Sequence, residues 1–292
     1  MGSRFLLALF WLLHWLPLPI LAAVGRGLGR VLHAVAGSRR KIALRNLELC
    51  FPEMSEADRR ALAKEHFLWL GRSILERGVL WFAPVKRLRR LIHVEGDVGL
   101  AERSDRAVMW LVPHFMALDV AGVATQIFQK QQVASIYQEQ TDAVMDAAIR
   151  RGRLRFQQGD VFPRSDSAKP LIRAIRKGWA FFNLPDMDFG ERDAAFVPFF
   201  GVPASTLLAP SRMARALDMV VQPVVAEMLP GGGGYRVRFL DAWTSFPSDD
   251  ALADTAAMNR WIESEIRKNP AQYLWVHKRF KTRPAGEPGL YS

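Results

Sequence analysis

His114 and Asp119 are the residues whose types and spacing suit proton transfer. A carboxylate that holds a histidine fixes its tautomer and stabilises the imidazolium, which suits a general base. Five residues correspond to about 140° around a helix, so two helical side chains at this spacing do not share a face. They meet if His114 precedes the helix and folds back over its first turns. On spacing alone, a capping histidine and a solvated aspartate form the simpler interpretation.

The segments around His114 predict how it is positioned. The apolar run 107–112 is typical of a buried strand that Pro113 ends, and the segment after His114 predicts a helix to about residue 129. Further apolar runs predict strands at 92–94, 133–137, 161–162, 179–184, 219–228 and 235–240. Helical spacing predicts helices over 38–49, 55–81, 141–155, 168–177, 207–217 and 251–268. This alternation predicts an α/β fold, a mixed central sheet flanked by helices, with His114 at the carboxyl end of a strand.

Three connections carry signals of their own. Residues 85–90 follow Pro84 and are typical of a basic turn, and 231–234 form a glycine-rich hairpin loop between the last two strands. Residues 197–206 predict an aromatic, glycine-kinked loop that leads into a helix.

The amino-terminal run 5–24 contains no charged residue. Its length matches the ~20 residues that cross a bilayer core. Pro17 and Pro19 would kink such a helix, so a tilted or half-inserted segment is the alternative. One basic residue, Arg4, precedes the run, and six follow it: Arg26, Arg30, Arg39, Arg40, Lys41 and Arg45. The positive-inside rule then places the bulk of the chain in the cytoplasm. We expect a membrane anchor over 1–36 and a catalytic domain over 37–292.

The net charge is strongly positive. The 292 residues include 40 Lys and Arg against 29 Asp and Glu, a formal charge of +11. This charge favours nucleic acid or an anionic membrane as a partner. The basic residues after the apolar run favour an anionic inner membrane, and without a recognised nucleic-acid motif we expect no nucleic-acid partner. A single cysteine, Cys50, excludes an internal disulfide and a cysteine-based metal site.

Four further clusters could contribute to a site. The segment 150–155 contains four arginines, whose guanidinium forks suit phosphate, although a basic helix face is the simpler interpretation. Arg164 follows a predicted strand and directs a charge toward a cleft mouth. Asp186 and Asp188 follow another strand, but two carboxylates are too few to predict a metal site. Phe200 and Gly201 mark the aromatic loop.

Taken in order, these clusters resemble a known family. His114-(four residues)-Asp119 resembles the signature of the lysophospholipid and glycerolipid acyltransferase superfamily. The resemblance becomes specific with later motifs, namely Phe162-Pro-Arg164, Leu184-Pro-Asp186-Met-Asp188-Phe-Gly190, Phe199-Phe-Gly201 and Gln222-Pro-Val-Val225. The whole set, with the carboxyl-terminal segment 269–281, is similar to the late lipid A acyltransferases of Gram-negative bacteria, which add secondary lauroyl or myristoyl chains.

The chain departs from the wider superfamily in two places. Glycerolipid acyltransferases typically carry Phe-Pro-Glu-Gly-Thr-Arg where this chain has Leu184-Pro-Asp186-Met-Asp188-Phe-Gly190. This departure favours the lipid A branch over glycerol phosphate acceptors. Many lipid A enzymes have Glu where Asp119 stands, and the shorter arm would reposition the imidazole slightly.

The resemblance implies transfer of an acyl chain from acyl carrier protein to a hydroxyl of a lipid A precursor, without a cofactor. In this scheme His114 takes the hydroxyl proton while Asp119 holds His114, and no covalent enzyme intermediate forms. It also implies substrate-binding or oxyanion-stabilising roles for a second set of residues: Arg153, Arg164, Asp186, Asp188, Phe200 and Gly201. Phe115 and Met116 either line an acyl groove or pack as core.

The expected location is the cytoplasmic face of the inner membrane. We expect the basic carboxyl-terminal residues His277, Lys278, Arg279 and Lys281 to form a surface lip that meets the membrane or the acidic carrier protein. Two alternatives stay open: an acyltransferase with another acceptor, such as a lysophospholipid, ornithine-type lipid or glycolipid, or a non-catalytic lipid-binding protein at the membrane.

Overall fold

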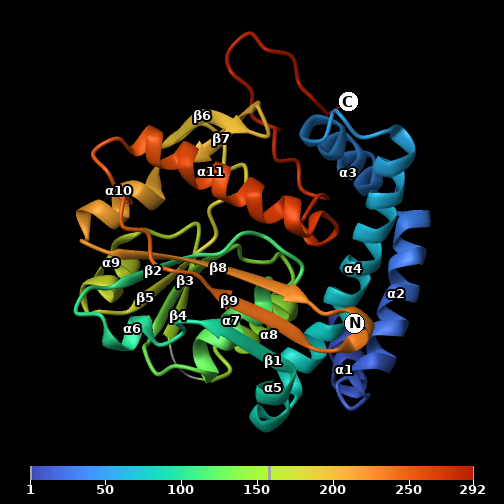
Figure 1. Ribbon diagram of the computed structural model, residues 1–292. Helices are drawn as coiled ribbons and strands as arrows, with labels where there is room; N and C mark the ends of the chain where they lie inside the picture. Colours follow the sequence, from blue (N-terminus) through green and yellow to red (C-terminus); the bar gives the residue numbers. More distant parts are fainter. Residues whose placement is uncertain (1, 157–158, 292) are drawn as a thin grey trace.

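The computed structural model describes residues 2–156 and 159–291 (Figure 1). Within this range, a seven-stranded sheet has the order β1-β9-β8-β2-β5-β3-β4. Its strands are β1 (Ile92–Gly96), β2 (Val108–Leu111), β3 (Val133–Tyr137), β4 (Gly159–Pro163), β5 (Ala180–Asn183), β8 (Val220–Met228) and β9 (Tyr235–Phe239). β8 and β9 pair antiparallel, and the other neighbours in the sheet pair parallel. The predicted mixed α/β fold is confirmed.

Helices cover both faces of the sheet because its central strands are apolar on both sides. Every residue of β2 is buried. Trp110 packs into one core with α7 (Leu118–Ile127), and its neighbours Met109 and Leu111 pack into a second core on the opposite face. The second core includes residues of α9 (Lys169–Arg176), α10 (Ala209–Ala216) and α11 (Ala251–Lys268). Figure 1 shows α10 and α11 on one side of the sheet and α7 with α8 (Ala143–Arg153) on the other.

The amino-terminal helices pack against the long helix α4 (Glu56–Phe82). The contact between α2 (Leu18–Val35) and α4 uses small residues, because a Cβ added at Gly71 would lie 2.3 Å from the carbonyl oxygen of Gly25. Only glycine lets the two backbones approach so closely. The segment before residue 36 is therefore packed along the rest of the chain, and its treatment as a separate anchor domain stays a prediction.

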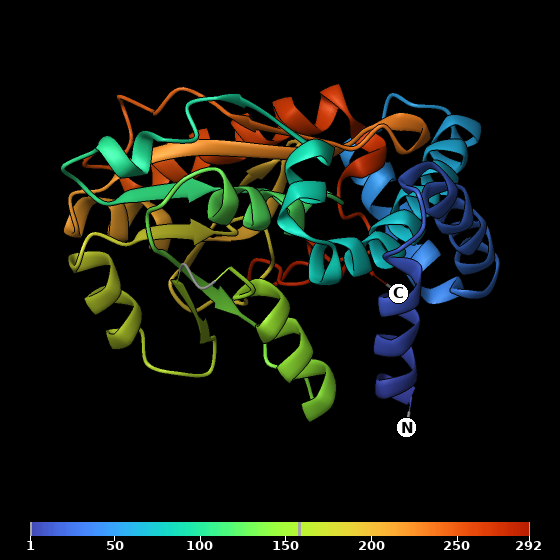
Figure 2. The same ribbon diagram turned by 90° about the horizontal axis from the view of Figure 1, so that it is seen from below.

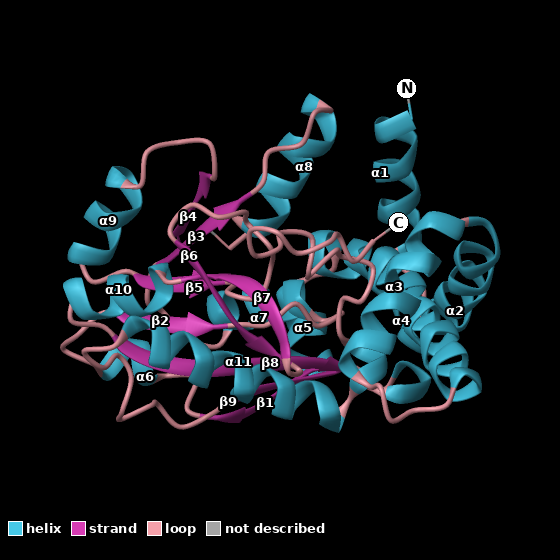
Figure 3. Cartoon of the chain, turned by 90° about the horizontal axis from the view of Figure 1, so that it is seen from above, coloured by secondary structure: helices cyan, strands magenta, loops and turns pink. Residues whose placement is uncertain are grey.

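The expected single helix over 5–24 is wrong. The run forms two helices, α1 (Gly2–Leu13) and α2, and α2 begins directly after Pro17. Proline lacks an N–H and clashes with the preceding turn, so the helix stops instead of bending. Among the described residues, α2 is the helix long and apolar enough to cross a membrane by length and composition. Figures 2 and 3 show α1 and α8 extending from the same side of the body, and the two helices contact each other.

Two connections differ from the sequence expectation. Residues 85–90 belong to a helix, α5 (Val85–Leu91), because Leu88 is buried while Lys86, Arg89 and Arg90 are exposed. Lys, Arg and Leu are also good helix formers. Residues 197–206 lie in an antiparallel hairpin of β6 (Ala194–Phe199) and β7 (Val202–Leu207). Phe200 and Gly201 form its turn with φ of 51° and 76°, as a tight hairpin requires.

The helix α3 (Gly37–Cys50) and the start of α4 agree with prediction. Ser55 precedes α4, and its hydroxyl accepts a hydrogen bond from the Asp58 backbone N–H at 3.1 Å. This bond satisfies one of the free N–H groups of the first turn.

Candidate active site

His114 lies in a short loop between β2 and α7, at the carboxyl end of the strand as predicted. The neighbouring parallel strand β5 ends at Asn183, and Asp186 follows it by three residues. Val112 donates a backbone hydrogen bond to Asn183 at 2.9 Å, which continues the pairing of the two strands beyond β2. Because carboxyl ends of adjacent parallel strands meet at one edge of a sheet, this pairing delivers Asp186 to His114.

Asp186 holds His114 with both carboxylate oxygens. Its Oδ1 lies 2.6 Å from His114 Nδ1, and its Oδ2 accepts the His114 backbone N–H at 2.8 Å. The Asp186 side chain has no exposed surface, whereas that of His114 retains 13 % exposure. Asp186 therefore fixes the imidazole ring through Nδ1, and part of the ring stays accessible to solvent.

The charge state of Asp186 defines the state of the histidine. Burial raises the pKa of the Asp186 carboxyl, but the charge of His114 and hydrogen bonds from His114 and Tyr273 outweigh burial and hold this pKa below its usual range. An ionised carboxylate only accepts hydrogen bonds, so Nδ1 of His114 carries the proton in this contact. In the neutral imidazole, Nε2 is then a free acceptor, which is the state that a general base requires.

Asp119 has different partners from those the sequence suggests. Within the described residues, Asp186 is the carboxylate that hydrogen-bonds to His114. Asp119 instead lies between two arginines. Arg77 of α4 approaches Asp119 at 3.0 Å, and Arg153 of α8 at 3.8 Å. The prediction that Asp119 holds His114 directly is wrong in geometry, because residue 119 is already inside α7 and points toward α4 and α8.

The charge of Asp119 still reaches the histidine through space. Burial raises the pKa of the Asp119 carboxyl, but Arg77, Arg153 and, more weakly, His114 lower it below its usual range. Asp119 is therefore an anion that anchors two guanidinium groups beside the His114 loop.

The carboxyl-terminal segment completes the site from the other side. Leu274 donates a backbone hydrogen bond to the His114 carbonyl at 3.0 Å, and Met116 donates one to Gln272 at 2.8 Å. Between them, the Tyr273 ring packs edge-on against Phe115, and its hydroxyl hydrogen-bonds to Asp186. The expected basic surface lip is wrong for Arg279, which is 3 % exposed and donates to the Ser205 carbonyl at 2.6 Å.

Asp188 holds this segment in place, and its predicted contact with a substrate stays a prediction. Its carboxylate accepts the backbone N–H and the hydroxyl of Thr282, both at 2.7 Å. Its own N–H donates to His277 Nε2 at 3.2 Å. Burial, together with the charges of His114 and Arg279, lowers the pKa of His277 to about 4, so this ring accepts as a neutral imidazole.

The remaining predicted site residues lie around the site or away from it. Arg164 follows β4 at the same edge of the sheet, and its guanidinium stacks 4.3 Å from the centre of the Phe189 ring. Phe200 and Gly201 sit at the β6–β7 turn, where the Phe200 N–H donates to Glu263 of α11 at 2.8 Å. The contacts of this turn, which include Arg267 over the Phe200 ring, anchor the hairpin to α11.

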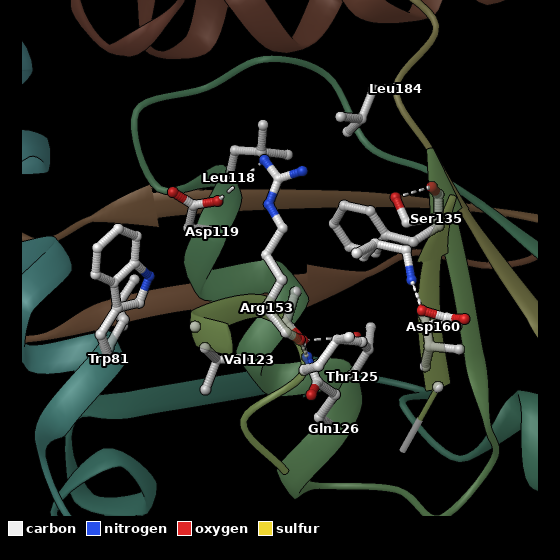
Figure 4. Close-up of a pocket in the computed structure, with 18 residues that line it drawn as sticks. Trp81, Leu118, Asp119, Val123, Thr125, Gln126, Ser135, Arg153, Asp160 and Leu184 are labelled. Carbon is white, nitrogen blue, oxygen red and sulfur yellow. Dashed lines mark hydrogen bonds and ion pairs between the residues drawn. The ribbon is translucent and has the colours of Figure 1, made fainter. Parts of the chain in front are cut away.

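An apolar groove runs beside the His114 loop (Figure 4). One face of α7 forms a wall of it, through Leu118, Asp119, Gly122, Val123 and Gln126. The strands and helices opposite add further side chains, mainly apolar: Leu80, Trp81, Val133, Val161, Phe182 and Leu184. Figure 4 shows Asp119 and the Arg153 guanidinium together toward one end and Gln126 toward the other. Phe115 and Met116 pack in the core instead, with 3 % and 8 % exposure.

Two residues of this site, Arg77 and Tyr273, could not be predicted from local sequence patterns. Arg77 occupies a helix face that looks solvated, yet it pairs with Asp119 and stacks over Trp81 at 5.8 Å. Tyr273 lies more than 150 residues from His114 along the chain, so spacing could not connect them. The carboxyl-terminal motif in the family resemblance was the available signal for Tyr273.

Comparison with known proteins decides the family. The family described as bacterial lipid A biosynthesis acyltransferase matches residues 2–282. The chain belongs to this family. It is 35 % identical to the lipid A biosynthesis lauroyltransferase of Escherichia coli (strain K12) over 98 % of this chain and 93 % of that protein. It is 33 % identical to the lipid A biosynthesis palmitoleoyltransferase of the same strain over 98 % of this chain and 92 % of that protein. It is also 33 % identical to the lipid A biosynthesis myristoyltransferase of that strain over 92 % of this chain and 82 % of that protein.

This lipid A acyltransferase also has a distant structural neighbour. The structure of the 1-acyl-sn-glycerophosphate (LPA) acyltransferase of Thermotoga maritima aligns with 78 % of this chain across 93 % of its own length. The sequence identity is 14 % and the TM-score is 0.37. The predicted membership of the lipid A branch is thus confirmed by sequence relatives that span almost the whole chain.

Proposed function

We propose that this acyltransferase moves a fatty acyl group from an acyl carrier protein to a hydroxyl of a lipid A precursor. The observation that carries the proposal is the His114–Asp186 pair, bonded at 2.6 Å beside an apolar groove. Leu184, which lines the groove, precedes Asp186 by two residues, and Leu118 follows His114 by four. The proposed base does not itself line the groove, but the groove begins four residues after His114 and two residues before Asp186.

The proposed reaction needs one base and no cofactor, because the donor thioester is already activated. His114 Nε2 takes the proton of the acceptor hydroxyl while the oxygen attacks the thioester carbonyl. The resulting tetrahedral oxyanion collapses and the carbon–sulfur bond breaks. His114 then gives its proton to the departing thiolate. Asp186 keeps Nδ1 protonated and stabilises the imidazolium between these two transfers, as the carboxylate does in a Ser-His-Asp triad. Cys50 is no competing nucleophile, since its thiol is buried and burial raises its pKa.

Asp119 has a supporting role in this scheme. It holds the Arg153 guanidinium at the groove and adds a negative charge near His114. We assign to Arg153 the contact with the acceptor phosphate or the developing oxyanion, which a guanidinium stabilises well. Arg164, exposed at the same sheet edge, is the proposed second phosphate contact.

The proposed location is the cytoplasmic face of the inner membrane. α1, α2 and the turn between them expose several large apolar side chains, including Phe5 at 73 %, Trp15 at 66 % and Val35 at 72 %. Such a surface is typical of a membrane contact, and the net charge of +11 favours anionic lipid and an acidic carrier protein. Flotation of the full chain with anionic vesicles measures this contact, and recovery entirely in the lipid-free fraction would overturn it.

The test of the reaction is transfer from labelled acyl-acyl carrier protein to a lipid A precursor. His114→Ala should lower kcat by about 10²- to 10⁴-fold, the usual contribution of a general base. Thermal unfolding is the check that the variant folds, because the buried Asp186 carboxylate loses one of its hydrogen-bond partners. A non-catalytic lipid-binding protein would show no turnover in the parent chain.

The acceptor is tested in the same assay. Lysophospholipid, ornithine-type lipid and glycolipid acceptors are offered singly beside the lipid A precursor. Transfer to one of these with none to the lipid A precursor would overturn the proposed acceptor while leaving the role of His114 intact.

A further inference from the structure

Three glycines line the apolar groove: Gly122, Gly152 and Gly159. Packing within the protein explains two of them. A Cβ at Gly152 would lie 2.4 Å from Trp81 Nε1, and one at Gly159 would lie 1.8 Å from the Val133 carbonyl oxygen. Gly159 also has φ of 147°, which L side chains rarely adopt.

Packing within the protein does not explain the glycine at residue 122. Apart from its chain neighbours and its own helix backbone, a Cβ at Gly122 meets no heavy atom of the described residues within 4 Å. Gly122 lies inside α7, where glycine costs about 1 kcal/mol relative to alanine. Its carbonyl accepts from Thr125 and Gln126, but any residue supplies a carbonyl. What glycine adds at this position is open space in the groove.

The polar groups along the groove are occupied within the protein. The Ser135 hydroxyl donates to the Phe182 carbonyl at 3.0 Å, and Asp160 pairs with Arg150 at 2.8 Å. Gln126 donates to the Arg153 carbonyl at 2.9 Å. Beyond the Asp119 and Arg153 end, these walls therefore suit an alkyl chain better than a polar ligand.

The position of Gly122 along the groove follows from helix geometry. Leu118, Asp119, Gly122, Val123 and Gln126 share one face of α7, and the face spans about 12 Å at 1.5 Å per residue. Gly122 lies about 4.5 Å beyond Asp119 on this face, in the direction of Gln126. Figure 4 shows the flanking residues Asp119, Val123 and Gln126 in that order along the helix.

We propose that Gly122 is a specificity-determining residue that sets how long an acyl chain the groove accepts. This inference rests on the proposed function, because it takes the groove as the site of the donor's hydrocarbon chain. A side chain at residue 122 would fill the groove part of the way along. It would block the far end for long chains and leave room for short ones.

The test is a competition among acyl donors. Purified full-length protein receives an equimolar mixture of decanoyl-, lauroyl-, myristoyl- and palmitoleoyl-acyl carrier protein with a lipid A precursor, and the products are quantified by mass. The product ratio reports relative kcat/KM and does not depend on the fraction of folded enzyme. In Gly122→Leu, the ratio of the longest to the shortest transferred chain should fall by at least about 10- to 200-fold, because a mismatch of one methylene already produces this range in an apolar pocket.

Two further variants make the result specific. Gly122→Ala adds one methyl group and should shift the ratio in the same direction by a smaller factor. Gly27→Leu is the matched control, since Gly27 also lies inside a helix, is half-buried and has no heavy atom of the described residues within 4 Å of an added Cβ, but does not line the groove. Its product ratio should equal that of the parent chain.

The outcomes separate the two proposals. If the parent chain transfers none of the donors, the proposed function fails. If the parent chain is active but Gly122→Leu and Gly122→Ala keep its product ratio, or lose all products in equal proportion, the assignment of Gly122 is overturned and the proposed function stands.

Discussion

Asp186 and Asp119 are both carboxylates with lowered pKa values near His114, but they are held in opposite ways. Asp186 has no exposed surface and binds the His114 ring and backbone. Asp119 keeps 27 % of its side chain exposed at the groove and faces two guanidinium groups. One carboxylate fixes a ring and its tautomer, and the other fixes charge at the entrance of a binding site. The carboxylate that holds His114 is thus set by the pairing of β2 with β5 and not by nearness along the chain.

The largest expected effect comes from changing the carboxylate that touches the ring. Asp186→Asn keeps the shape but lets the amide donate a hydrogen bond, which favours the wrong tautomer of His114. We expect kcat for acyl transfer to fall by about 10³- to 10⁴-fold, by analogy with the same change in a Ser-His-Asp triad. Steady-state kinetics measures this, with thermal unfolding as the check on folding. A smaller loss in Asp186→Asn than in Asp119→Asn would reverse the assignment of the two carboxylates.

Mild acid should affect the protein through buried histidines before it affects either carboxylate. Burial lowers the pKa of His66 to about 4, and that of His277 is also about 4. Between the unfolded pKa near 6.5 and pH 4, the unfolded chain binds more protons at these residues, so stability falls as pH decreases. For fully buried His66 the loss reaches about 3 kcal/mol. Asp186 and Asp119 have lowered pKa values, so their stabilisation is present above about pH 4 and is lost only below it.

Thermal unfolding between pH 7 and pH 4 measures this slope. His66→Gln should remove its share of the slope, because glutamine binds no proton in this pH range. An identical slope in His66→Gln and the parent would contradict the assignment.

The smallest effect is expected at the groove entrance. Asp119→Asn leaves the His114–Asp186 bond in place but removes the charge that holds Arg77 and Arg153. Losing charge-assisted bonds worth about 1.5–3 kcal/mol corresponds to about a 10- to 100-fold lower kcat/KM. Arg77→Met should act through the same contact, so in a double-mutant cycle its effect should be much smaller when Asp119 is already changed. Fully additive losses would show that Arg77 and Asp119 act independently.

Much of the fold follows from local patterns in the sequence. Apolar runs located the strands of the central sheet, and Pro113 marked the end of β2 before His114. The hairpin of β6 and β7 could not be predicted from alternation, because Phe196, Val197, Pro198 and Phe199 are all apolar although the structure exposes two of them and buries two. Gly201 was the available signal for the tight turn.

The contacts of the site could not be derived in the same way. Asp186 reaches His114 because β5 lies beside β2, and nothing in local periodicity specifies that pairing. Arg77 reaches Asp119 because α4 crosses near α7 and α8, which is a property of tertiary packing. The family resemblance named Asp186 and Arg153, but only the assembled fold shows which residue each of them binds.

The distribution of the site along the chain has a consequence for the order of synthesis. The apolar helices α1 and α2 are made first, whereas Tyr273, which hydrogen-bonds to Asp186, belongs to the last part of the chain. At about 5–20 residues per second, translation from Val35 to Tyr273 takes roughly 10 to 50 s. The helices with exposed apolar faces therefore leave the ribosome well before the His114–Asp186 pair can be completed. The apolar face that we propose to contact the membrane is thus available before the site is complete.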